Sequence, residues 1–81
     1  PRRPDVAGPT PLEAGNLSPT IESDAPGSIV SLLDTHGLYA VQVADETGNT
    51  TFPLNVVKDS TLTITVSGPE LNAVTLEIPV K

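Results

Sequence analysis

The chain has 81 residues, no cysteine, one histidine and a formal net charge of −6 at pH 7. This length allows one domain at most, the lack of cysteine excludes a disulfide framework, and a single histidine cannot supply a structural zinc site. The acidic balance disfavours binding to nucleic acid or to an anionic membrane surface, and no stretch approaches the roughly 20 apolar residues of a membrane-spanning helix. We therefore expect no cofactor, no nucleic-acid partner and no membrane span.

Residues 1–27 are predicted to form an extended arm outside the folded domain. The segment holds six of the nine prolines. Proline fixes φ and removes a backbone donor, and each residue before a proline is pushed towards extended geometry. The apolar residues stand singly between the prolines, so with two arginines they are predicted to bind a protein partner or a neighbouring copy of the chain. These predicted anchors are Arg2, Arg3, Val6, Leu12, Leu17 and Ile21.

Residues 28–81 are predicted to form a small antiparallel β-sandwich or flattened barrel of about five to seven strands. Apolar and polar residues alternate with a period of two, which is typical of half-buried strands. The predicted strands are Ser28–Leu33, Leu38–Ala44, Thr51–Val57, Thr61–Val66 and Asn72–Val80. Ser28–Leu33 is expected to form a second layer, together with a short strand at Thr20–Ser23. Because short connections make consecutive strands antiparallel neighbours, the last four are predicted to form an up-and-down meander. Pro53 lacks a backbone donor, so its strand is expected at an edge or bulged.

The larger apolar side chain at every second position is predicted to face the core. In the clearest strand, leucine, isoleucine and valine at positions 62, 64 and 66 alternate with threonine. The same rule places Tyr39, Val41 and Val43 inward, and Ala40 and Gln42 outward. Outward threonines are typical of solvated strands, although such faces also suit carbohydrate or ice binding.

The turn Asp34-Thr35-His36-Gly37-Leu38-Tyr39 is the sharpest local motif. It resembles the tyrosine corner of immunoglobulin-like sandwiches, in which the tyrosine hydroxyl bonds to the backbone. The stretch from Gly37 to Asn49 also resembles a run found in bacterial immunoglobulin-like repeats. The resemblance implies structural roles for Asp34, Gly37 and Tyr39. In that family one strand follows the tyrosine, whereas three predicted strands follow it here, which implies a smaller or rearranged sandwich.

Two turns hold polar side chains that a catalytic or metal site could use. His36 lies between an aspartate and a tyrosine, but a Ser-His-Asp site needs a serine within hydrogen-bond reach, and no motif places one there. We therefore interpret His36 as a turn residue. Asp45, Glu46 and Asn49 hold oxygen donors in one hairpin loop, as calcium would require, but without the spacing of an EF-hand. A polar turn and a calcium loop both remain open for this segment.

No catalytic motif is present, and the chain is predicted to be a non-enzymatic attachment module. Pro1 is a residue type before which an initiator methionine is removed, which favours a complete small product. A small chain with an arm resembles in kind the decoration (cement) proteins of phage capsids. The leading hypothesis is therefore a virion-surface protein that grips the capsid through its arm. The alternative is an immunoglobulin-like repeat of a bacterial surface or secreted protein, with an adhesion or carbohydrate-binding role and residues 1–27 as a linker.

Overall fold

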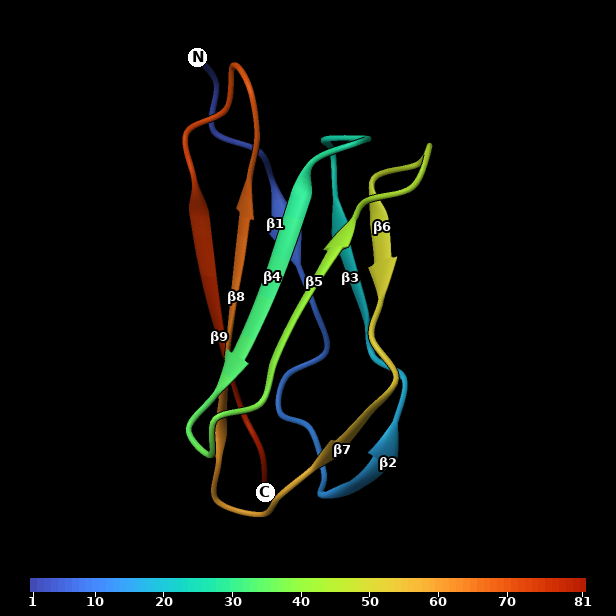
Figure 1. Ribbon diagram of the computed structural model, residues 1–81, viewed down its shortest axis with the longest axis vertical. Helices are drawn as coiled ribbons and strands as arrows, with labels where there is room; N and C mark the ends of the chain where they lie inside the picture. The colour runs from blue at the N-terminus through green and yellow to red at the C-terminus, as the bar shows by residue number, and fades with distance from the viewer.

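The protein is built from β-strands in two packed layers, and it has no helix that is long and apolar enough to cross a membrane (Figure 1). The computed structural model describes all residues from 1 to 81, and the molecule measures 36 × 19 × 19 Å along its principal axes. The strands are β1 (Val6–Ala7), β2 (Gly15–Leu17), β3 (Thr20–Ser23), β4 (Ile29–Asp34), β5 (Tyr39–Val43), β6 (Asn49–Thr51), β7 (Leu54–Val56), β8 (Thr61–Ser67) and β9 (Val74–Pro79). One layer is a four-stranded antiparallel sheet in the order β5-β4-β8-β9, and the other combines the sheets β1-β3-β6 and β2-β7. These findings confirm the predicted all-β antiparallel sandwich.

The strands are shorter and more numerous than predicted, and Pro53 is one reason. The segment predicted as a single strand over Thr51–Val57 forms β6 and β7, with Pro53 between them. Since proline has no N–H for a ladder, pairing breaks there, and the two halves join different strands, β6 with β3 and β7 with β2. The predicted meander is therefore wrong: β5 pairs with β4, and only β8 and β9 remain neighbours among the last four predicted strands.

Residues 1–27 belong to the sandwich, which corrects the predicted boundary at residue 27. They supply β1, β2 and β3, and none of their prolines lies within these strands. Leu12 and Ile21 are part of the same hydrophobic core as the rest of the chain, and Ile21 is only 1% exposed. The Leu12 N–H donates to the Pro79 carbonyl (3.0 Å), and the Leu12 carbonyl accepts from the Lys81 N–H (2.8 Å). The prolines thus cut the segment into pieces that are too short for a periodic signal but long enough to pair.

The core lies between the two layers and takes side chains from both. Its centre is on β8, where the alternating side chains Leu62, Ile64 and Val66 are fully buried, as the pattern predicts. Phe52 and Val56 reach the same core from the opposite layer, on either side of Pro53. Burial of this kind stabilises by about 1.5–3 kcal/mol for each large apolar side chain. The buried cluster comprises Leu12, Ile21, Val30, Leu32, Ala44, Phe52, Leu54, Val56, Leu62, Ile64, Val66, Ile78 and Val80.

β5 presents the opposite face from the one predicted. Its large apolar side chains point outward and are exposed, whereas Ala40 and Gln42 between them are half-buried. The exposed side chains are Tyr39, Val41 and Val43. The cause is the register with β4: the fully buried Leu32 lies opposite Ala40, and residues directly opposite on antiparallel strands share a face. The alternation of β5 alone does not contain this information, because the pairing with β4 decides whether the odd- or the even-numbered residues of β5 face the core.

Candidate functional site

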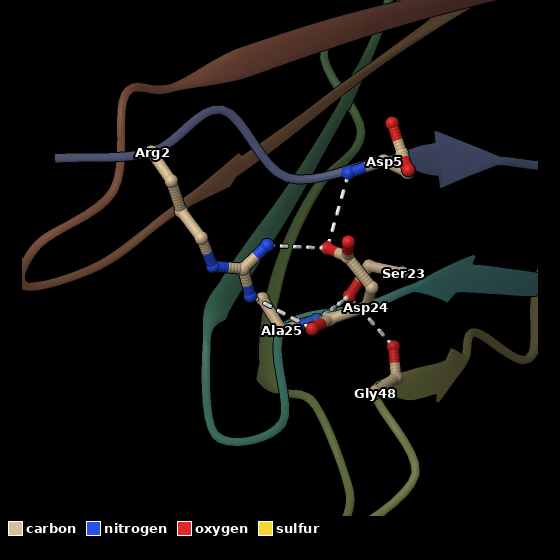
Figure 2. A network of polar contacts seen from close by, with 6 residues as sticks. All are labelled: Arg2, Asp5, Ser23, Asp24, Ala25 and Gly48. Atoms are coloured by element: carbon tan, nitrogen blue, oxygen red, sulfur yellow. Dashed lines mark hydrogen bonds and ion pairs between the residues drawn. The ribbon is translucent and has the colours of Figure 1, made fainter.

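The N-terminal residues are held on the body by a polar network around Asp24 (Figure 2). The Arg2 guanidinium donates to Asp24 Oδ1 (2.9 Å) and to the Asp24 carbonyl (2.8 Å). The Asp5 N–H donates to the same Oδ1 (3.1 Å). These contacts, the hydrogen bond from Arg2 first, lower the pKa of the Asp24 carboxyl from its ordinary value of 3.8, against a smaller opposing effect of desolvation. Arg2, predicted to bind a partner, is therefore engaged within its own chain.

The same network joins β3 to the loop before β6 (Figure 2). Both the Ser23 N–H (3.0 Å) and the Ser23 hydroxyl (2.9 Å) donate to the Gly48 carbonyl. The Ala25 N–H in turn donates to the Ser23 hydroxyl (3.2 Å). Gly48 has a φ of +88°, and a Cβ atom placed on it would lie 2.1 Å from the Ser23 carbonyl oxygen. Only glycine therefore fits at this contact between the end of β3 and the loop before β6.

The apolar residues predicted as partner anchors serve the protein's own core, which corrects that prediction. Leu12 and Ile21 are buried in it, and Val6 and Leu17 are half-buried and packed against it. Among the six predicted anchors only Arg3 is both exposed and outside the network around Asp24. The structure does not bring the six together on one surface that a partner could grip.

The Asp34 turn is organised by its carboxylate. Asp34 is buried, and its Oδ1 accepts hydrogen bonds from the N–H groups of His36 (2.9 Å) and Leu38 (2.7 Å). Gly37 supplies the positive φ of +89° that the turn needs. Tyr39 is 65% exposed at the start of β5, so the buried tyrosine corner implied by the resemblance is not formed. His36 is exposed at the tip of the turn.

The Asp45 loop is likewise organised by one carboxylate oxygen. Asp45 Oδ1 accepts from the Thr47 N–H (2.9 Å), the Thr47 hydroxyl (2.8 Å) and the Asn49 N–H (2.9 Å). These hydrogen bonds, that from Asn49 first, lower the pKa of the Asp45 carboxyl from its ordinary value of 3.8. No group of three or more His, Cys, Asp or Glu residues is arranged to hold a metal ion. The arrangement is that of a self-capped polar turn, with Glu46 exposed beside it.

Asp24 and Asp45 together predict a loss of stability in acid. The folded-state pKa of each carboxyl is lowered, so its stabilising contribution is complete above the unfolded-state value of 3.8 and is lost as the pH falls below it. We expect the urea midpoint to be level between about pH 7 and pH 5 and to decline below about pH 4. In Asp45→Asn the midpoint should be lower at pH 7 and its decline in acid shallower. A midpoint that increases on acidification would contradict the assignment.

The outer face of the four-stranded sheet is divided into an apolar half and a polar half. Five of the six exposed large hydrophobic residues lie on the outer rows of β4 and β5. They are Ile29, Leu33, Tyr39, Val41 and Val43. The register places Ile29 opposite Val43 and Leu33 opposite Tyr39. The outer row of β8 carries threonines instead, and Thr65 and Thr63 lie opposite Thr75 and Glu77 of β9.

The sequence-based reasoning missed this apolar surface, although a signal for it was present. β4 has apolar residues on both of its faces, with Ile29 and Leu33 pointing outward and Val30 and Leu32 pointing inward. A strand with an apolar residue on both faces indicates either burial on both sides or a second surface. The two hollows of the molecule are both open depressions and lie elsewhere, at residues 16–18 with 53–55 and at residues 5–7 with 22–24. Neither of them includes His36.

No protein family and no curated protein matches the sequence. Two solved structures resemble the fold: the Arg-specific cysteine proteinase gingipain R (RGPB), and the complex of the Porphyromonas gingivalis RgpB pro- and mature domains. Each has a TM-score of 0.80 and 22% sequence identity over 98% of this chain. This chain spans only 18% and 19% of those two chains, respectively. The likeness is therefore one of fold, to a part of a longer protein.

Proposed function

We propose that this chain is a non-enzymatic β-sandwich module that spaces and attaches other domains within a longer bacterial surface or secreted protein. The observation that carries the proposal is the position of the two termini. Pro1 and Lys81 lie at opposite ends of the long axis (Figure 1). Domains joined to the two ends would be held apart by the 36 Å length of the sandwich. A body with this geometry acts as a spacer in a chain of domains.

Two further observations support a module. All segments of the chain, residues 1–27 included, contribute to one core, so the sandwich holds the elements of an independently folding unit. The solved structures that share its fold contain it as less than a fifth of a longer chain, and their printed names describe a bacterial proteinase. The fold alone does not carry that activity to this chain.

Capsid decoration through an arm stays a prediction. It has less support from the structure than from the sequence, because residues 1–27 are part of the sandwich. That hypothesis needed an arm free to lie along a neighbour. Leu12 and Ile21 are buried in the protein's own core, and Arg2 pairs with Asp24. A partner that captured these residues would first have to unfold the layer containing β1, β2 and β3.

An immunoblot distinguishes a domain of a longer surface or secreted protein from a small capsid-decoration protein. Antibodies raised against the folded sandwich should detect a protein well above 8.4 kDa, the mass of this chain, in the cell-surface or culture-medium fraction. Pre-adsorption with the purified sandwich provides the control for specificity. A band of 8.4 kDa that sediments with virus particles would overturn the proposal and favour capsid decoration.

A further inference from the structure

β5 has an open edge with a complete set of free backbone groups. It pairs only with β4, at the end of the order β5-β4-β8-β9. The residues just before and just after it use their backbone groups towards β4: the Leu38 carbonyl accepts from Asp34, and the Ala44 N–H donates to Ser28. Backbone direction alternates along a strand, so the odd-numbered residues between them point their N–H and C=O groups away from β4. These residues are Tyr39, Val41 and Val43.

The opposite edge of the same sheet is covered. Leu12 pairs with Val80 just beyond the end of β9, and Arg2 pairs with Leu71 before its start. β9 also carries Glu77 and Pro79, which are residues that natural edge strands use against unwanted pairing. β5 has none of these protections, since its sequence Tyr-Ala-Val-Gln-Val contains no charge, no proline and no glycine. The molecule thus protects one edge and leaves the other available.

The side chains beside this open edge are apolar as well as exposed. Val43 is 66% and Tyr39 65% exposed, and Ile29 and Leu33 of β4 extend the same surface. The patch is on the order of a few hundred Å², the size at which the largest patch of a monomer is often functional. An open edge bordered by such a patch is a template for an added strand.

We propose that two copies of this chain pair through β5, antiparallel, about a two-fold axis at Val41. In this register Val41 lies opposite Val41 of the second copy, and Tyr39 lies opposite Val43 of the second copy. The facing odd-numbered residues have their N–H and C=O groups pointing towards the partner, so each of these pairs exchanges two hydrogen bonds, whereas Ala40 and Gln42 face each other as non-hydrogen-bonded pairs. The tyrosine–valine pairs add cross-strand contacts of the aromatic–β-branched kind. The two four-stranded sheets become one continuous sheet, and the interface is isologous.

The local charges along β5 allow a second copy to occupy the edge. Each copy carries a net charge of −6, so self-association requires that acidic groups do not meet. The register places Asp45 opposite Gly37 and Glu46 opposite His36 of the second copy, while β5 itself is uncharged. The acidic loop of each copy therefore lies beside Gly37 and His36 of the second copy, in a turn whose one carboxylate, that of Asp34, is buried. A contact one strand wide is small, so we expect a weak dimer that depends on concentration.

Sedimentation equilibrium of the purified chain between about 5 µM and about 1 mM tests the proposal. The apparent mass should increase towards twice 8.4 kDa. Val41→Pro removes a backbone N–H that makes no hydrogen bond within one copy. Because both copies carry the substitution, the dimer loses both Val41–Val41 hydrogen bonds, and dimerisation should weaken at least tenfold. Val41→Thr keeps the N–H and the β-branch and should dimerise within about threefold of the wild type. A wild-type chain that stays monomeric at about 1 mM would overturn the proposal.

Two further measurements distinguish edge pairing from packing of the apolar faces. Leu33→Lys places a charge within the patch but leaves the β5 backbone intact, so the dimer should persist. If Leu33→Lys abolishes the dimer and Val41→Pro does not, the copies pack face to face and the proposal is wrong.

Amide hydrogen exchange tests the register without any substitution. Protection of Tyr39, Val41 and Val43 should increase with concentration, while Ala40 and Gln42 are protected at every concentration by β4. Unchanged exchange at the odd-numbered amides of a dimeric sample would also overturn the edge model. This inference is independent of the proposed function, because the immunoblot reports chain length and location whereas these measurements report self-association.

Discussion

Deletion of residues 1–19 is expected to unfold the protein. It removes β1 and β2, leaves β7 without its partner strand, and takes Leu12 out of the core. A buried Leu→Ala change alone costs about 2–5 kcal/mol, while a domain of this size has a total stability of about 4–12 kcal/mol. The additional loss of two paired strands should cost more free energy than this total stability. Circular dichroism during urea titration should show no cooperative transition for the truncated chain.

Arg3→Ala is the control for this deletion, because Arg3 belongs to the same segment but its side chain is exposed. Its free energy of unfolding should stay within about 0.5 kcal/mol of the wild type. A truncated chain that keeps the wild-type midpoint would mean that residues 1–19 are separable from the sandwich, as an attachment arm would be.

Gly48→Ala is expected to destabilise the protein by more than about 3 kcal/mol. The φ of +88° costs an L-residue about 1–2 kcal/mol by itself. In addition, the new Cβ would overlap the Ser23 carbonyl, which is backbone and cannot rotate away. The two hydrogen bonds from Ser23 to the Gly48 carbonyl would be displaced with it. Thermal unfolding followed by circular dichroism measures the change.

Gly37→Ala is the matched control for that substitution. Gly37 has nearly the same φ, +89°, but a Cβ on it meets nothing within 4 Å. The cost should therefore be the conformational part alone, about 1–2 kcal/mol. Equal losses in the two variants would show that the contact between Gly48 and β3 contributes nothing beyond backbone strain.

Much of the fold follows from local patterns. The alternation of β8 predicts its buried face correctly, and Thr20–Ser23 is a strand with the predicted bounds. The Asp34 turn also forms where the sequence Asp34-Thr35-His36-Gly37 indicates it. These features succeed because each depends on interactions within one strand or one turn, and a few neighbouring residues contain all the information.

The candidate site was harder to predict from the sequence. The open edge and the exposed apolar rows of β4 and β5 depend on which strand pairs with β5 and in which register, and a one-residue change of register would reverse the face of Tyr39. The prediction that Leu12 and Ile21 anchor a partner was wrong for a related reason. Leu12 and Ile21 stand alone in a proline-rich segment, and solitary apolar residues carry no signal of whether they will be buried by their own chain or by a partner.

Composition, alternation and turn residues therefore specify an acidic, all-β chain with its turns and the longer strands β4, β5, β8 and β9, because these are local properties of the backbone and of side-chain periodicity. The pairing of the layers, the incorporation of residues 1–27, the outward face of β5 and its open edge were decided only in the assembled sandwich. Hydrogen bonds between distant strands and the filling of a shared core select among arrangements that are locally equivalent. The surface on which two copies are proposed to meet is one result of that selection.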